Sequence, residues 1–323
     1  MNEVRKSIGV DVGKEKLDVC YPDGTKETIK NIKSSRTKLI AKAIRMDAII
    51  AFEATGSYED PLAEECLAKG VKAVRLDAWG TRRFAESQGR LEKTDAIDSE
   101  MIRDYAMSLK EDRLRFVKPR SQAQKRLKTA VCVRKNLMKA KSILFNQLEH
   151  ITDSEIKRKL ISDIEKLGKD IEKAAEECDK VIASDERMQN LFMRFQLVKG
   201  IGPCTARIVL ARCPDIGGFT KRGIAKMCGI APLEHTSCTI QKKSRTRRGR
   251  SDLKEALHMA AVAAVKSNPI LRKFYQRLLA KGKSKQVALT AVARKLAVLL
   301  NTIAKYPDFV PAQDSADGSK SVK

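Results

Sequence analysis

The chain has 323 residues, and its 65 lysines and arginines outnumber its 40 aspartates and glutamates, for a formal net charge of +25. This length predicts about two domains. With 8 cysteines, no CxxC pair and only 3 histidines, the composition disfavours a zinc site and is typical of free thiols in a reducing cytoplasm. No signal peptide opens the chain and no apolar run approaches the ~20 residues of a membrane span, so we expect a cytoplasmic protein without a membrane partner.

The positive charge is concentrated in the last part of the chain. Residues 1–110 carry +1 (20 basic, 19 acidic), residues 111–190 carry +5 (19 and 14) and residues 191–323 carry +19 (26 and 7). This arrangement indicates that the basic C-terminal segment binds a polyanion and that the near-neutral N-terminal segment, with its clustered acids, acts on it. The alternative is a basic protein whose charge only prevents aggregation.

Residues 1–115 predict a mixed α/β domain. Two short apolar or alternating runs and the turn Pro22-Asp23-Gly24 predict a three-stranded hairpin arrangement over residues 4–30. Later segments alternate between helix and buried strand, and the predicted order is helix 35–46, strand 48–52, helix 58–69, strand 71–76 and helix 95–109. A hairpin followed by parallel crossovers matches the RNase H-like arrangement.

Residues 116–190 predict a helical arm. Glycine and proline are almost absent, and apolar residues recur at helical spacing, as at Leu127 and Val131 or Ile156 and Leu160. The pattern predicts two long antiparallel helices in a coiled-coil-like arm. Such an arm serves as a spacer or an oligomerisation surface, and the alternative is a plain helical hairpin packed on its own domain.

Residues 191–310 predict an all-helical domain, and the polar residues 311–323 predict a frayed tail. The segment Val198–Ala206 has the pattern of a helix–hairpin–helix, in which a Gly-x-Gly turn lets backbone amides at a helix start approach a phosphate. A purely structural helix corner is the alternative. The candidate nucleic-acid contacts of this motif are Lys199, Gly200, Gly202, Thr205 and Arg207.

A second basic element lies at residues 242–250, just before a helix predicted at 252–265. Its place in the most basic segment favours phosphate contact over a merely solvated loop. Aromatic residues make up only 5% of the chain, so we expect recognition of backbone and shape to dominate over base stacking. The candidate contacts are Lys242, Lys243, Arg245, Arg247, Arg248 and Arg250. Helices at 270–281 and 284–304 complete the domain.

Four acids in the first hundred residues form the candidate catalytic site. Asp11 and Glu53 each end an apolar strand, and Asp95 and Asp98 are three residues apart on a predicted helix, hence on one face. In an RNase H-like sheet the strands that carry Asp11 and Glu53 are neighbours. Clustered carboxylates repel one another unless a cation neutralises them, which predicts a Mg²⁺ site, with Mn²⁺ as the alternative ion. For Asp95 and Asp98 alone, first-turn acids favoured by the helix dipole would be the simpler interpretation.

The chain resembles the DEDD insertion-sequence transposases, a family that includes the Piv-type site-specific DNA invertases. The resemblance covers residues from about 7 to 304, with the motifs in the expected order. Its segments are Gly9–Lys14, Glu53–Tyr58, Lys93–Asp98, Val198–Ala206, Cys228–Pro232 followed by Ser237, Arg248–Arg250 and Leu257–Ala260.

The resemblance implies a RuvC-like catalytic domain, a coiled-coil arm and a helical transposase domain with a nucleophilic serine. By its position after Gly-Ile-Ala-Pro that serine is Ser237, and Ser244 and Ser251 are backup candidates. The family usually has glycine after the serine, whereas this chain has Cys238, which puts the local backbone in question. The implied reaction is attack by Ser237 on DNA, which gives a covalent phosphoserine linkage, followed by strand exchange and religation.

The resemblance also implies partners. They are donor and target DNA, a structured guide RNA and further copies of this chain in a dimer or tetramer, in which one subunit's carboxylates meet another's serine. We expect a bacterial or archaeal protein associated with the nucleoid. The open alternatives are a Piv-like invertase acting on fixed sites, a RuvC-like junction endonuclease that uses water, and a nucleic-acid-binding protein with a degenerate site.

Overall fold

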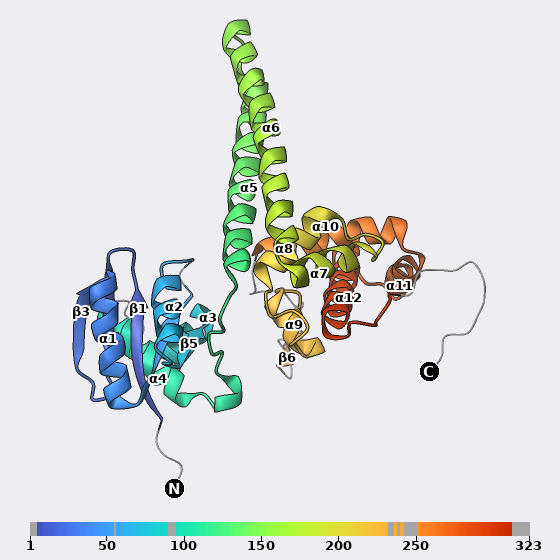
Figure 1. The fold of residues 1–323 in the computed structure, drawn as a ribbon. Helices are drawn as coiled ribbons and strands as arrows, with labels where there is room; N and C mark the ends of the chain where they lie inside the picture. The colour runs from blue at the N-terminus through green and yellow to red at the C-terminus, as the bar shows by residue number, and fades with distance from the viewer. Residues whose placement is uncertain are drawn as a thin grey trace. The chain divides into compact units, whose positions relative to one another are not determined.

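The computed structural model describes residues 5–54, 56–89, 95–231, 236–237, 240–241 and 251–311, without the side chains of residues 95–97, 236–237 and 240–241. The chain forms two compact units, and the boundary lies between Pro119 and Arg120, close to the predicted end of the first domain (Figure 1). The predicted arm and the predicted helical domain together make up the second unit. The predicted tail at 311–323 lies outside the described residues beyond position 311.

The first unit is built on a five-stranded sheet with the order β3-β2-β1-β4-β5. The central strand β1 pairs antiparallel with β2 on one side and parallel with β4 on the other, and β4 pairs parallel with β5. This confirms the predicted hairpin followed by crossovers. The strands are β1 Lys6–Val12, β2 Lys16–Cys20, β3 Lys26–Lys30, β4 Ala48–Glu53 and β5 Ala73–Leu76.

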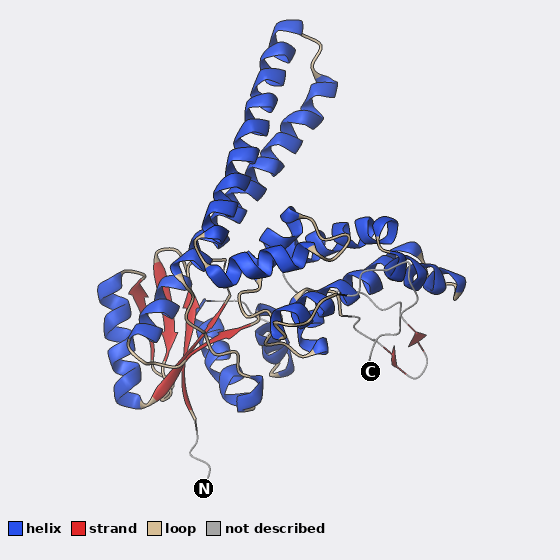
Figure 2. Cartoon of the chain, turned by 45° about the vertical axis from the view of Figure 1, so that its right-hand side comes forward, coloured by secondary structure: helices blue, strands red, loops and turns tan. Residues whose placement is uncertain are grey.

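Helices cover both faces of this sheet, because its inner strands are apolar on both sides (Figure 2). On one face, Ile8 and Phe52 share a buried cluster with residues of α1 (Lys33–Met46) and α2 (Asp60–Ala68). On the other face, Ala51 and Val74 share a cluster with residues of α4 (Asp95–Ser108). The edge strand β3 alternates between exposed and half-buried residues, as expected where one face is solvated.

One helix of this unit was not predicted. Helix α3 (Ala78–Ser87) follows β5, and it begins where the Asp77 side chain accepts a hydrogen bond from the Gly80 amide. It packs on α4, with the rings of Phe84 and Tyr105 5.5 Å apart. The interval between the predicted strand and the predicted helix at 95 therefore contains a further element beside the sheet edge.

The predicted arm is a hairpin of two long helices, α5 (Gln122–Gln147) and α6 (Ser154–Ala183), which pack along each other (Figure 1). A capping box at Ser121 starts α5, and the Asp153 side chain caps α6. Only the base of the arm joins the large core of the unit, through residues such as Leu127 and Ile182.

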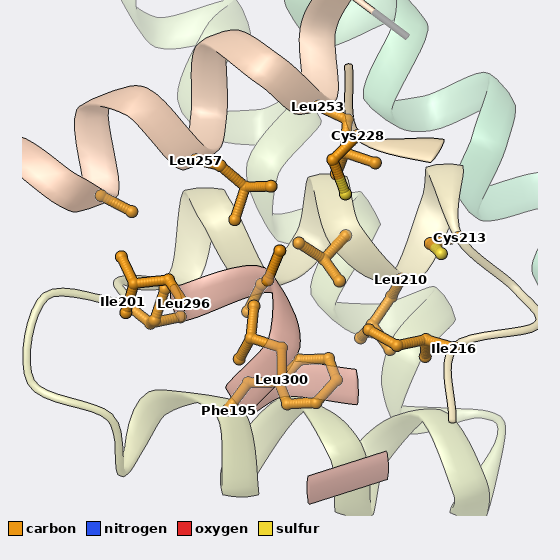
Figure 3. Packing of buried hydrophobic residues seen from close by; sticks show 14 of the residues in the cluster. Phe195, Ile201, Leu210, Cys213, Ile216, Cys228, Leu253, Leu257, Leu296 and Leu300 are labelled. Carbon is orange, nitrogen blue, oxygen red and sulfur yellow. The ribbon is translucent and has the colours of Figure 1, made fainter. Parts of the chain in front are cut away.

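The body of the second unit is helical, as predicted, with α9 as an addition. Its core is formed by apolar residues far apart in sequence, among them Phe195, Leu257 and Leu300 of three helices and Ile201 of the turn before α8 (Figure 3). A short strand pair, β6 (Thr236–Ser237) and β7 (Ile240–Gln241), lies between α9 and α10 in sequence. The helices are α7 Glu186–Gln196, α8 Pro203–Arg212, α9 Lys221–Met227, α10 Ser251–Ser267, α11 Pro269–Ala280 and α12 Lys285–Lys305.

Helix α12 corrects one expectation. Within the described residues it is the one helix long and apolar enough to cross a membrane by length and composition, with a mean hydropathy of 1.6. The sequence interpretation found no such run. Helix α12 nevertheless contributes Val292, Leu296 and Leu300 to the core of the second unit, and it carries Arg294 and Lys295 in its middle. Its apolar character is accounted for by packing inside the protein.

Candidate active site

Asp11 and Glu53 are neighbours on the sheet. The parallel pairing of β1 with β4 reaches Val10 opposite Phe52, and Asp11 and Glu53 are the next residue of each strand. Side chains alternate between the two faces of a strand. Ala51, two residues before Glu53, packs in the cluster that contains Ile102 of α4, so Glu53 and Asp11 belong to the face that α4 covers.

Gly9 lets α4 lie directly on β1. A Cβ atom at Gly9 would be 2.1 Å from the carbonyl oxygen of Ser99 and 2.5 Å from the amide nitrogen of Arg103. Such distances are not tolerated, so only glycine permits this approach. Because Ser99 follows Asp98, the contact holds the start of α4 beside the strand that ends in Asp11.

The electrostatics of Glu53 show that the acids are gathered. Burial raises the pKa of Glu53 above its ordinary value, the negative charges of Asp11, Asp98 and Asp77 raise it further, and a hydrogen bond from Thr81 opposes the shift. Asp11 of β1 and Asp98 of α4 therefore lie near enough to Glu53 for their charges to act on it. Glu53 and Asp98 are half-buried. An anionic cluster of this kind favours a bound cation.

Asp77 and Thr81 were not among the predicted residues. Asp77 directly follows β5, whereas Glu53 is the last residue of β4 and Asp11 the last but one of β1. An acid at the end of an apolar strand was nevertheless a signal present in the sequence. Thr81 is only 4% exposed, and its hydrogen bond to Glu53 comes from the first turns of α3. Because helix α3 was not predicted from the sequence, the inward-facing hydroxyl of Thr81 could not be predicted either.

The donor set suits a hard divalent cation, since every candidate ligand is a carboxylate oxygen. Within the described residues, no group of three or more acids, histidines or cysteines lies close enough to hold a metal ion. The side chain of Asp95, the fourth predicted ligand, is outside that description, although its backbone begins α4. The ligand set and the catalytic roles of Asp11, Glu53, Asp95 and Asp98 stay predictions.

The predicted nucleophile lies on a short strand. Ser237 is the last residue of β6 and pairs with Ile240, but its side chain is outside the described part of the chain. Ser251 begins α10 and is exposed. Cys238, the backup Ser244 and all six cations of the basic element, Lys242, Lys243, Arg245, Arg247, Arg248 and Arg250, also lie outside the described residues.

The predicted helix–hairpin–helix corresponds to α7, a turn and α8. Gly200 has φ +105°, and a Cβ atom there would be 2.5 Å from the Cβ of Ala264, so this glycine is required by both its backbone and its packing. Gly202 caps α8 and has open space around it, and Lys199 is exposed. Lys199 and Gly202 are exposed at the start of α8, whereas Gly200 packs against Ala264.

Two other predicted contacts of this motif have internal roles. Thr205 is 8% exposed. The Arg207 guanidinium donates two hydrogen bonds to Asp179 of α6, from Nε to Oδ1 at 2.7 Å and from Nη2 to Oδ2 at 2.6 Å. The pair joins the body to the base of the arm, so Arg207 is held inside the unit, and its contact with nucleic acid stays a prediction.

Two family models match the chain. One, a transposase model of the DEDD type of IS110, matches residues 8–155. The other, the transposase IS116/IS110/IS902 family, matches residues 193–276. The chain belongs to this IS110-type transposase family. The match confirms the resemblance found in the sequence, and the DEDD type suggests the use of a divalent metal.

Curated relatives agree with this assignment. The chain is 24% identical over 303 residues to the pilin gene-inverting protein of Moraxella lacunata and 23% identical over 301 residues to that of Moraxella bovis, and each match covers 90% of this chain and 92% of the relative. It is also 34% identical over 98 residues to a protein of Streptomyces coelicolor described as insertion element IS110 uncharacterized 43.6 kDa protein. That match covers 30% of this chain and 24% of the relative. This IS110-type chain is a DNA recombinase or transposase, an enzyme that acts on DNA.

Proposed function

We propose that Asp11, Glu53, Asp95 and Asp98 form a RuvC-like Mg²⁺ site and that Ser237 is the nucleophile that cuts DNA, with Mn²⁺ as the alternative ion. The placement of Glu53 carries this proposal: it is the neighbour of Asp11 on the sheet, and its pKa is raised first by burial and then by the charges of Asp11 and Asp98. Carboxylates gathered in this way destabilise one another, and they are expected where a cation is to be bound.

The reaction is a transesterification. When bound, the divalent cation supplies a Lewis acid that polarises the scissile phosphate. The Ser237 oxygen attacks phosphorus, so a serine oxygen–phosphorus bond forms while the bond from phosphorus to a sugar oxygen breaks. The serine loses one proton and the departing sugar hydroxyl gains one. The phosphodiester energy is kept in the serine ester, and attack by another sugar hydroxyl rejoins the DNA without ATP.

The complete site joins two copies of the chain. The carboxylates belong to the first unit and Ser237 to the second. In the proposed dimer or tetramer, the carboxylates of one subunit act with the serine of another. Such an arrangement confines cleavage to the assembled complex, which protects DNA from isolated subunits.

The proposed substrates are the donor and target DNA of an insertion sequence, and the reaction takes place in the cytoplasm. The basic second unit binds the DNA, and a structured guide RNA selects its sequence. The net charge of +19 over residues 191–323 supports a unit that binds polyanions. If a guide RNA selects the sequence by base pairing, the protein itself needs only backbone and shape contacts.

A Piv-like invertase is the second candidate. The two Moraxella pilin gene-inverting proteins match 90% of this chain, which favours the same chemistry applied to fixed sites. A hydrolytic junction endonuclease would use the same carboxylates without Ser237. The three candidates differ in whether a covalent intermediate forms and whether an RNA is bound.

Covalent trapping tests the nucleophile. The full-length protein is incubated with Mg²⁺ and a nicked DNA substrate, and the products are separated under denaturing conditions. We expect a protein–DNA adduct in the wild type and in Ser244→Ala and Ser251→Ala, and no adduct in Ser237→Ala. An adduct that persists in Ser237→Ala would reject this serine, and cleavage without any adduct would favour the hydrolytic endonuclease.

A matched pair of variants tests the carboxylates. Asp11→Asn should abolish the adduct, whereas Glu64→Gln, at an exposed acid of α2, should retain it. Purification from cells followed by sequencing of bound RNA tests guidance separately. An enriched structured RNA supports the transposase, and its absence together with a covalent adduct supports the invertase.

A further inference from the structure

Trp79 is an exposed aromatic residue beside the acidic cluster. It is the single tryptophan of a chain that is poor in aromatics, and it is 44% exposed. It lies in the first turn of α3, two residues after Asp77, whose charge acts on Glu53. The exposed part of a tryptophan ring offers a flat, apolar aromatic surface to a ligand.

Helix α3 is fixed to the acidic cluster by its inner side. Gly80 and Thr81 are buried, the Thr81 hydroxyl is hydrogen-bonded to Glu53, and a Cβ atom at Gly80 would lie 2.4 Å from the hydroxyl oxygen of Tyr105. Trp79 is therefore carried on a rigid element at a set position relative to Glu53. The helix cannot shift far without disturbing a candidate ligand.

The outer side of α3 combines an aromatic ring with cations. Residues four apart on a helix are neighbours, and the guanidinium carbon of Arg83 lies 5.0 Å from the centre of the Trp79 ring. The side chain of Arg82 is 77% exposed and that of Arg83 is 58% exposed. Both pair with Glu86 at the surface, and such exposed pairs are weak enough to yield to a phosphate.

We propose that Trp79 stacks on an unpaired nucleobase of the strand whose phosphate lies at the carboxylates, while Arg82 and Arg83 contact the flanking phosphates. This inference rests on the proposed function. Stacking suits any base, because every base has a π face, and an adjacent guanidinium strengthens it. The bases of an intact duplex are paired and stacked on each other, so the ligand is a single-stranded segment of DNA or RNA.

The single tryptophan makes the test specific. Its fluorescence, excited selectively over tyrosine, reports on this position alone in the full-length protein. The probes are a single-stranded DNA, a single-stranded RNA of the same sequence, the duplex DNA and an abasic DNA strand of equal length. We expect strong quenching by a strand with bases, and weak quenching by the duplex and the abasic strand although both bind. The DNA and RNA arms identify the ligand.

Two variants separate stacking from folding. Because these variants lack the single tryptophan, their binding is followed by the fluorescence anisotropy of a dye-labelled strand. Trp79→Ala should weaken binding of that strand about 5- to 100-fold without changing the salt dependence, since stacking releases no counterions. Trp79→Phe keeps a ring and should bind within a few-fold of the wild type. Tyr306→Ala, at another exposed aromatic residue in the second unit, serves as the matched control and should bind normally.

The outcomes are distinct from those of the proposed function. Equal quenching by the abasic strand, or wild-type binding by Trp79→Ala, would overturn the stacking role even if the covalent adduct forms. Quenching by bases in a protein that forms no adduct would leave the stacking role standing and reject the nucleophilic mechanism. Protection of Trp79 by a second copy of the chain, seen as a fluorescence change on dilution without nucleic acid, would also overturn it.

Discussion

Gly9 of β1 lies against Ser99 of α4, where a Cβ atom would come within 2.1 Å of the Ser99 carbonyl oxygen. This contact between a strand and a helix far apart in sequence sets where Asp98 lies relative to Asp11. It assigns Gly9, a residue without functional groups, a positioning role in the candidate active site.

Gly9→Ala should therefore move Asp98 of α4 away from Asp11 of β1. The added methyl group forces α4 away from β1, and overpacking of this kind costs about 1–3 kcal/mol in the free energy of unfolding. Thermal unfolding measures that loss of stability. The yield of the DNA adduct should fall strongly even under conditions in which the variant remains folded. Gly168→Ala in the middle of α6 is the control, because its Cβ would meet only the flexible end of Lys141 of α5, and it should be neutral or stabilising. Full adduct formation by Gly9→Ala would contradict the positioning role.

Glu53→Gln should stabilise the metal-free protein at neutral pH. The folded-state pKa of Glu53 is raised above its ordinary value of 4.5, so the ionised side chain opposes folding at pH 7. That penalty disappears as the pH falls through the folded-state pKa, and it is fully relieved below the unfolded value. The amide removes the charge and can still accept the Thr81 hydrogen bond, so we expect a gain of about 0.5–2 kcal/mol.

Unfolding measured with and without Mg²⁺ completes this test. Mg²⁺ should stabilise the wild type and have a much smaller effect on Glu53→Gln, because one carboxylate of the cluster is gone. The difference in stability between the two proteins without Mg²⁺ should shrink as the pH is lowered toward 4.5. An unchanged difference at all pH values would show that charge is not its cause.

The sequence predicted the site where local patterns define it and failed where distant contacts do. Asp11 and Glu53 stand out because each ends an apolar strand, and the sheet order follows from the hairpin and crossovers. Helix α3 was missed because Trp79 and Gly80 interrupt any simple apolar period, although Asp77 at its start was a recognisable cap. That Gly9 faces Ser99 is a tertiary contact, and no local pattern indicates it.

Arg207 illustrates the same limit in the second unit. Its charge and its place after the glycine-rich turn favoured a phosphate contact. The structure instead pairs it with Asp179, 28 residues earlier, and that hydrogen bond raises the pKa of Arg207. Whether a cation is available for DNA depends on the acids folded beside it, which a charge count cannot show.

Arg207→Ala should consequently affect stability more than DNA binding. Loss of two charge-assisted hydrogen bonds lowers the free energy of unfolding by about 1–3 kcal/mol, toward the lower end because Asp179 is partly exposed. Arg126→Ala, which removes an exposed pair with Glu177 on the same arm, is the control and should cost under about 1 kcal/mol. Denaturant unfolding and DNA-binding titrations measure the two effects. A large loss of affinity with unchanged stability would restore Arg207 as a phosphate contact.

Lys199→Ala should show the opposite behaviour. Lys199 is exposed at the turn before α8 and is expected to contact a phosphate, so its removal should leave thermal stability unchanged and weaken DNA binding. The slope of log affinity against log salt should decrease by about 1, the amount expected for one lost phosphate contact.

Two further variants frame the Lys199 result. Lys30→Ala, on the edge strand of the first unit, removes the same charge from the other unit and should leave the salt slope unchanged. Gly200→Ala should destabilise the protein, because it strains a backbone with φ +105° and crowds Ala264. If Lys199→Ala and Lys30→Ala changed the salt slope equally, the effect would come from net charge alone. The turn would then be a structural helix corner rather than a DNA contact.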